Sequence, residues 1–174
     1  MTTETKLEII ARSLEAIANA GLLNDEHCKN PIKAFIRQAT ETSSWHATAH
    51  WRSKEVSEKI RLQVANGMTS RSNYQKYCSE NFRHEHVVPC EVIYKMLIKF
   101  EKADDFIKIL EKYSIRATIT ISQDNELNRL KLKSKMPEEF NLIGNRYYED
   151  PFARYKAAGF YNEMEDRGSR EFWI

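Results

Sequence analysis

The amino-acid sequence contains no long hydrophobic run. Among its 174 residues no apolar stretch approaches the roughly 20 that a membrane-spanning helix needs, and 30% of the residues are charged. The opening MTTETKLEII has neither the basic start nor the apolar core of a secretory signal, so we expect a cytoplasmic protein with no membrane partner. A hydrophobic share of 41% is enough for one buried core, and we therefore expect one compact domain.

Cysteine is scarce, and the bulk charge is small. Cys28, Cys78 and Cys90 are too few and too widely spaced for a disulfide framework or paired CxxC zinc ligands, and we interpret them as small apolar residues in a reducing compartment. The net charge of +2 does not by itself require a nucleic-acid partner. Residues 45–83 carry seven Lys or Arg against three acids, and residues 129–135 hold a second basic run. Each run fits either a phosphate-facing surface or a solvated charged face.

Apolar spacing predicts that residues 1–80 form a helical subdomain. Residues 5–23 repeat apolar side chains at intervals of three and four, as an amphipathic helix does. A second helix is expected to start at Pro31, since proline is favoured in a first helical turn. Similar patterns predict helices over 53–67 and from Thr69 or Ser70 onward.

The pattern changes near Phe82. We expect residues 81–174 to form a second unit that contains both strands and helices. Two strands and four helices are expected in it: strands at 82–88 and 116–121, and helices at 91–101, 104–113, 122–133 and 150–159. Ser122 is the expected cap of the third helix, and Asp150 that of the fourth. The predicted fold class is α+β, mostly helical.

The stretch 83-RHEHVVPCE-91 gathers side chains capable of metal or proton chemistry ahead of an apolar step. In an extended strand His84 and His86 point to one face and Glu85 to the other. Both histidines could bind zinc. Alternatively, Glu85 could hold a hard divalent cation while His86 takes a proton from water, which suits phosphodiester hydrolysis. A surface strand edge with no chemical role is the third interpretation.

The five residues 85-EHVVP-89 resemble the first motif of the HNH, or ββα-metal, nucleases. In that family an acidic or histidine metal ligand is followed at once by the general-base histidine and, after two apolar residues, by proline. The resemblance implies that Glu85 binds metal and that His86 is the catalytic base. It also implies a second strand and a following helix, and the segments RATITI and SQDNELNRL supply them.

The same resemblance implies a further metal ligand on that helix. Asn125 is the expected ligand, with Asp124 or Asn128 as neighbours able to share the role. The sequence departs from the family in three respects. About 25 residues of helical pattern separate the two strands, the expected helix histidine is absent, and no CxxC pair offers a structural zinc site.

The implied activity is that of a metal-dependent DNA endonuclease of the restriction or phage-defence kind. Magnesium is the expected metal, with manganese or zinc as alternatives, and double-stranded DNA is the expected partner. Arg83, His84, Arg129 and Lys131 are the expected phosphate contacts. Palindromic cutting would require a homodimer. The alternative function is a non-catalytic nucleic-acid- or protein-binding module with a degenerate ββα unit. Convergence of Asp124 and Asn125 on Glu85 and His86 would favour the enzyme.

Two further patterns have a structural interpretation that we prefer. His46 and His50 are four residues apart and could bind zinc on a helix, but they lack the intervening acid of HExxH and are flanked by tryptophans. We interpret them as part of a packed aromatic surface. The aromatic segments 146–155 and 170–174 could stack on bases, although core or dimer packing is the favoured interpretation.

Overall fold

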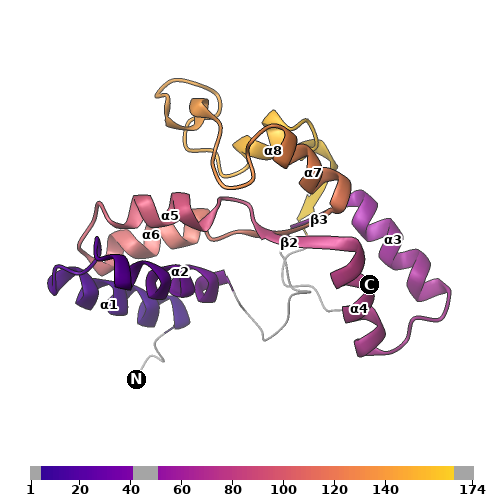
Figure 1. Cartoon of the computed structure of the whole chain (residues 1–174), viewed down its shortest axis with the longest axis horizontal. Coiled ribbons are helices and arrows are strands. Elements are labelled where there is room, and N and C mark those ends of the chain that lie inside the picture. The colour runs from indigo at the N-terminus through magenta and orange to yellow at the C-terminus, as the bar shows by residue number, and fades with distance from the viewer. Residues whose placement is uncertain (1–4, 41–50, 167–174) are drawn as a thin grey trace.

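The computed structural model describes residues 5–40 and 51–166, and these form helices grouped around a small mixed sheet (Figure 1). In chain order the elements are α1 (Lys6–Asn19), α2 (Glu26–Thr40), β1 (Trp51–Ser53), α3 (Lys54–Ala65), α4 (Arg71–Asn81), β2 (Phe82–His86), α5 (Cys90–Leu97), α6 (Ala103–Tyr113), β3 (Arg116–Thr120), α7 (Ile121–Arg129), η1 (Glu138–Asn141), α8 (Ala153–Ala157), η2 (Tyr161–Glu163) and β4 (Met164–Asp166). The predicted class, α+β and mostly helical, is confirmed.

Side-chain caps explain where several helices begin. The hydroxyls of Thr5, Ser53 and Ser70 each accept a hydrogen bond from the amide three residues later. Each bond satisfies one of the amides that a helix start leaves without an intrahelical partner. The starts of α1, α3 and α4 were therefore recognisable in the sequence.

Three helix starts differ from the prediction. The helix α8 begins at Ala153 with no side-chain cap, in place of starting at Pro151 under an Asp150 cap. The helix α2 begins at Glu26, with Pro31 inside it, because the Asp25 carboxylate accepts the His27 amide at 2.7 Å and organises an earlier first turn. The helix α7 is capped by Thr120 in place of Ser122. The side chains of Thr120 and Gln123 exchange hydrogen bonds with each other's backbone amides in a capping box.

The N-terminal 80 residues also differ from the expected helical subdomain, because they contribute the strand β1. This strand lies inside the sheet, whose order is β2-β3-β1-β4. It is parallel to β3, with Trp51 opposite Ala117, and antiparallel to β4. A three-residue strand is too short to show a period of two, so its pairing partners decide its structure.

The strands β2 and β3 form the antiparallel pair that the sequence predicts. Their register runs from Phe82 opposite Thr120 to His86 opposite Arg116. The helices α5 and α6 occupy the connection between the two strands, and α7 follows β3 without a loop. The chain therefore has a strand, strand and helix in ββα order, with a helical pair inserted between the strands (Figure 1).

Three apolar clusters hold these elements together. Phe106 is in the largest, which joins α1, α2, α5 and α6 at one end of the molecule. Leu127 and Tyr155 lie in the second, between the sheet and α7 and α8. Val56 and Phe82 are in the third, between the sheet and α3 and α4. Full burial of such a side chain contributes about 1.5–3 kcal/mol.

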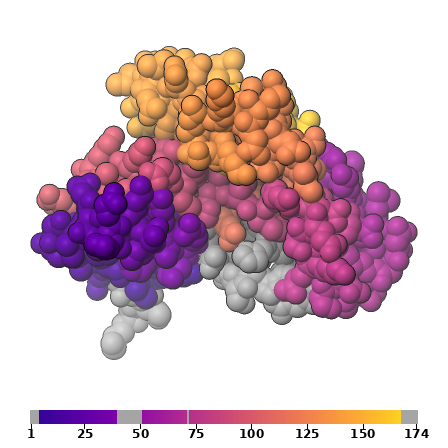
Figure 2. All heavy atoms as spheres, in the orientation of Figure 1, coloured from indigo at the N-terminus to yellow at the C-terminus, as the bar shows by residue number. Residues whose placement is uncertain are grey.

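The C-terminal third of the described chain covers one side of the molecule. Figure 2 shows its orange and yellow atoms along the top of the molecule in this view. Among the described helices none has the length and apolar character of a membrane span.

Candidate functional site

Strand alternation separates Glu85 from the two histidines beside it. Glu85 is opposite Ala117, which packs in the cluster under α7 and α8, so the Glu85 side chain lies on that face of the sheet. His84 is opposite Thr118, and its Nδ1 lies 2.8 Å from Thr118 Oγ1 on the other face. The predicted division between Glu85 and the histidines is therefore confirmed.

Glu85 is held by two residues of α8. Arg154 Nη2 lies 2.9 Å from Glu85 Oε1, and the Tyr155 hydroxyl donates to the same oxygen at 2.5 Å. Burial raises the pKa of Glu85 above its ordinary value, although Arg154 and Tyr155 both favour the charged form. Burial and the neighbouring Glu85 also raise the pKa of Tyr155, which therefore stays a donor.

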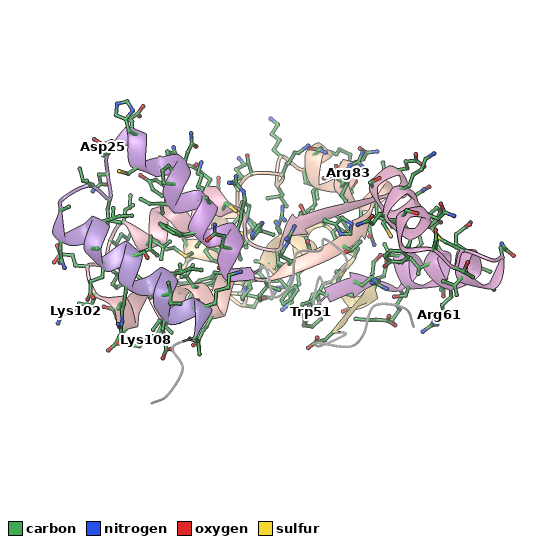
Figure 3. All side chains as sticks on the ribbon, turned by 90° about the horizontal axis from the view of Figure 1, so that it is seen from below. Asp25, Trp51, Arg61, Arg83, Lys102 and Lys108 are labelled. Atoms are coloured by element: carbon green, nitrogen blue, oxygen red, sulfur yellow. The ribbon has the colours of Figure 1, made fainter. Side chains whose placement is uncertain are left out.

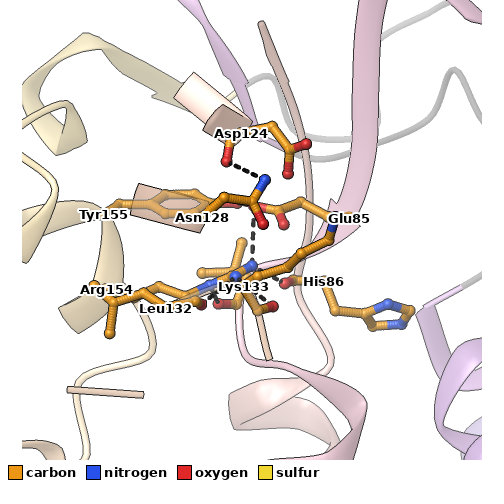
Figure 4. Close-up of polar contacts among 9 residues, drawn as sticks. Glu85, His86, Asp124, Asn128, Leu132, Lys133, Arg154 and Tyr155 are labelled. Atoms are coloured by element: carbon orange, nitrogen blue, oxygen red, sulfur yellow. Dashed lines mark hydrogen bonds and ion pairs between the residues drawn. The ribbon is translucent and has the colours of Figure 1, made fainter. Parts of the chain in front are cut away.

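The guanidinium of Arg154 connects three segments of the chain (Figure 4). Its Nε donates to the Val87 carbonyl at 2.7 Å, and its Nη2 donates to the His86 carbonyl at 2.5 Å. Its Nη1 donates to the carbonyls of Leu132 and Lys133 at 3.1 and 3.3 Å. With 1% of its side chain exposed, Arg154 fastens the end of β2 and the segment after α7 to α8.

From α7, Asp124 and Asn128 lie beside Glu85 (Figure 4). The charge of Asp124 contributes to the raised pKa of Glu85. Asn128 Nδ2 donates to the Asp124 carbonyl at 2.9 Å, since residues four apart share a helix face. Asn125 is exposed, and it is turned by about 100° from Asp124 around the helix. The structure therefore brings Asp124 to Glu85 in place of Asn125.

The imidazole of His86 is directed away from Glu85 and Asp124 (Figure 4). Burial, together with the charges of Arg116, Arg37 and Arg154, lowers the pKa of His86 to about 4. His86 is therefore neutral at pH 7, as a general base must be, but its ring lies on the face opposite the carboxylates.

The face that holds the histidines also holds a buried arginine. Arg52 of β1 is opposite Thr118, so it flanks this threonine on the side away from His84. Arg52 Nη2 lies 3.5 Å from the hydroxyl of Tyr74, a group whose pKa burial raises to about 12. On this face Arg52 is also opposite Glu165 of β4, which accepts a hydrogen bond from the Ser57 hydroxyl at 3.2 Å, whereas Glu85 and Asp124 lie on the face under α7.

The expected phosphate contacts other than His84 are exposed. Arg83 lies in the half of the molecule that holds α3 and α4 (Figure 3). Arg129 donates from Nε and Nη2 to the Glu126 carboxylate, at 2.8 and 2.6 Å, in an exposed pair within α7. Lys131 has a φ of 59° in the turn that ends α7. Arg129 and Lys131 therefore lie at the end of the helix that supplies Asp124.

The oxygen atoms on this face match a hard cation better than zinc. Glu85 and Asp124 supply carboxylates and Asn128 an amide oxygen, the ligand types that magnesium and manganese prefer. Within residues 5–40 and 51–166 no three His, Cys, Asp or Glu side chains form a group that could hold a metal. A cation here would thus rest on two carboxylates and complete its shell with water or phosphate.

Sequence reasoning did not identify Arg154 and Tyr155 as partners of Glu85. The segment DPFARY indicated a capped helix or a base-stacking surface, whereas Asp150 Oδ1 accepts the Phe152 amide at 3.0 Å in the turn before α8 and does not cap the helix. His46, His50 and residues 170–174 lie outside the described residues.

Comparison with family models, curated proteins and solved structures found no match to this chain.

Proposed function

We propose that this protein is a metal-dependent nuclease that hydrolyses DNA phosphodiester bonds, with β2, β3 and α7 as its catalytic unit. The observation that carries the proposal is the meeting of Glu85 from β2 with Asp124 from α7 on one face of the antiparallel pair. This arrangement accompanies the motif EHVVP, which resembles that of the ββα-metal nucleases.

When bound, magnesium would polarise the phosphoryl group and neutralise charge on the leaving oxygen. Glu85, Asp124 and Asn128 would hold the ion. The contacts of Arg154 and Tyr155 with Glu85 both fall on Oε1, so they would fix the carboxylate and leave Oε2 available to hold the ion. Arg154 and Tyr155 are thus positioning residues in this proposal.

His86 would accept the proton of the attacking water. Its neutral state at pH 7 suits this role. Because the His86 side chain leaves β2 on the face opposite Glu85, the role requires the backbone at the end of β2 to turn when nucleic acid binds. Catalytic hydrogen bonds often form only in the substrate complex. Exposed Arg83, Arg129 and Lys131 would contact phosphates, and a homodimer would place two such sites on a palindrome.

A second function, a non-catalytic nucleic-acid-binding module, is favoured by the ion pair between Arg154 and Glu85. In that case Arg154 balances the charge of Glu85 permanently, and His86 is a neutral residue of the opposite face. The basic residues around α7 would then bind DNA without cutting it.

Cleavage of plasmid DNA by the purified protein, in magnesium, manganese or EDTA, tests the proposal. We expect metal-dependent cutting that His86→Ala reduces at least about 100-fold, as loss of a general base does. Asp124→Asn should reduce it to a similar degree, because it removes a carboxylate that would hold the ion. The matched control is Asn125→Ala, next to Asp124 but exposed, which should cut as wild type does. Binding without cutting in every metal, unchanged in Asp124→Asn, would establish the binding module.

A further inference from the structure

A separate open groove lies between the inserted helices α5 and α6 and the segment that follows η1. Its volume is about 530 Å³, within the range of small-ligand sites. Its charged lining residues are Lys99, Lys108, Lys112 and Glu149, and its exposed aromatic lining residues are Phe100 and Tyr148. None of them belongs to the site around Glu85.

The charged side chains of the groove are mainly cationic. The groove is lined by three lysines and one glutamate, so its charged lining residues carry a net charge of +2. Lys112 pairs with Glu149 at 2.8 Å, whereas Lys108, with 75% of its side chain exposed, lies 3.5 Å from Asp105. Exposed pairs of this kind are weak and exchange readily for an incoming anion. Lys99 is exposed at the edge of the groove.

The same groove presents aromatic rings to the surface. Phe100 and Tyr148 are each 39% exposed, and the buried side chains of Tyr113 and Phe140 line the same groove. An exposed aromatic ring beside lysines is the arrangement with which proteins hold unpaired bases, because the ring stacks on the base while the lysines contact the phosphates.

We propose that this groove binds an unpaired strand of nucleic acid. Phe100 and Tyr148 would stack on a base, and Lys99 and Lys108 would contact the flanking phosphates. Charge complementarity favours an anion over a neutral apolar peptide, and the aromatic rings favour a base over a simple acidic chain. The proposal does not depend on cleavage at Glu85, because α5 and α6 form an insertion with a surface of its own.

Fluorescence anisotropy with a labelled oligothymidine of about 12 nucleotides, a length within the site sizes of known single-strand binders, tests this proposal. The measurement is made in EDTA, so no metal-dependent cutting occurs. We expect Phe100→Ala and Tyr148→Ala each to weaken binding about tenfold, as loss of one stacked base does. The double variant Lys99→Gln/Lys108→Gln should weaken binding and flatten its dependence on salt.

The matched controls lie on α3, at the other end of the molecule. Leu62, 62% exposed, and Lys59, half exposed, are each on the surface. Leu62→Ala and Lys59→Gln should bind as wild type, which separates binding in this groove from a general effect of surface substitution. Equal binding of a duplex, binding of polyglutamate in place of DNA, absent binding, or DNA binding that the groove variants leave unchanged would each overturn the proposal.

Discussion

Arg154 Nη2 lies 2.9 Å from Oε1 of Glu85, and the arginine side chain is 1% exposed. The same guanidinium donates to four backbone carbonyls that belong to the end of β2 and to the segment after α7. This one side chain therefore both balances a buried carboxylate and holds together the elements that position it.

Replacing Arg154 by alanine should destabilise the fold by about 3–5 kcal/mol, because it leaves the buried Glu85 carboxylate without its counter-charge. Arg154→Lys should recover only part of the loss, since an ammonium cannot form the forked set of bonds. Urea unfolding measures both. Arg129→Ala, which breaks an exposed pair, is the control and should cost less than about 1 kcal/mol. Equal losses for Arg154 and Arg129 would contradict the structural role.

Tyr155→Phe should destabilise the protein more at pH 7 than at pH 4. The hydroxyl favours the charged form of Glu85, so its removal raises the pKa of Glu85 further. A carboxyl whose pKa is raised in the folded state lowers the free energy of unfolding at high pH. This destabilisation disappears as pH falls, because the group becomes protonated in both states. Urea unfolding at the two pH values measures the difference, and a loss that is the same at both would show that the hydroxyl does not act through Glu85.

His86 should make the fold less stable as pH falls from about 6.5 to about 4. Its pKa is lowered to about 4 in the folded state, so over this interval only the unfolded chain binds the proton. This lowering of the His86 pKa on folding corresponds to about 3 kcal/mol in the free energy of unfolding. The stability of wild type minus that of His86→Gln, followed by urea unfolding from pH 7 to pH 4, should decrease by about this order. A constant difference would mean that the imidazole is not buried as described.

Magnesium or manganese should raise the melting temperature, because a ligand that binds only the folded state stabilises it by mass action. Asp124→Asn should abolish this rise, while Asn125→Ala should retain it, since Asp124 lies beside Glu85 and Asn125 is exposed. Differential scanning calorimetry at several metal concentrations is the measurement. A rise lost in Asn125→Ala and kept in Asp124→Asn would return the ligand role to Asn125.

Thr120→Ala should cost about 1 kcal/mol, and Ser122→Ala only a few tenths, because Thr120 caps α7 and Ser122 is an exposed residue of its first turn. Thermal unfolding of the two variants makes the comparison. Equal costs would indicate that the start of α7 is set by packing and not by this cap.

Local sequence determined most of the secondary structure. Hydrophobic spacing and hydroxyl caps were sufficient to predict α1, α3, α4, β2 and β3, because a period and a cap are properties of neighbouring residues. The alternation of HEH likewise placed Glu85 and the histidines on opposite faces. The motif EHVVP directed attention to the strand that the structure pairs with β3.

Only the tertiary structure decided which side chains meet Glu85. Arg154 and Tyr155 approach it from α8, far along the chain, and Asp124 faces it in place of Asn125 because of the way α7 packs on β3. The strand β1 likewise exists because β3 and β4 pair with it. Such contacts join residues that are distant in sequence, and burial and complementary charge select them, so no local pattern contains them.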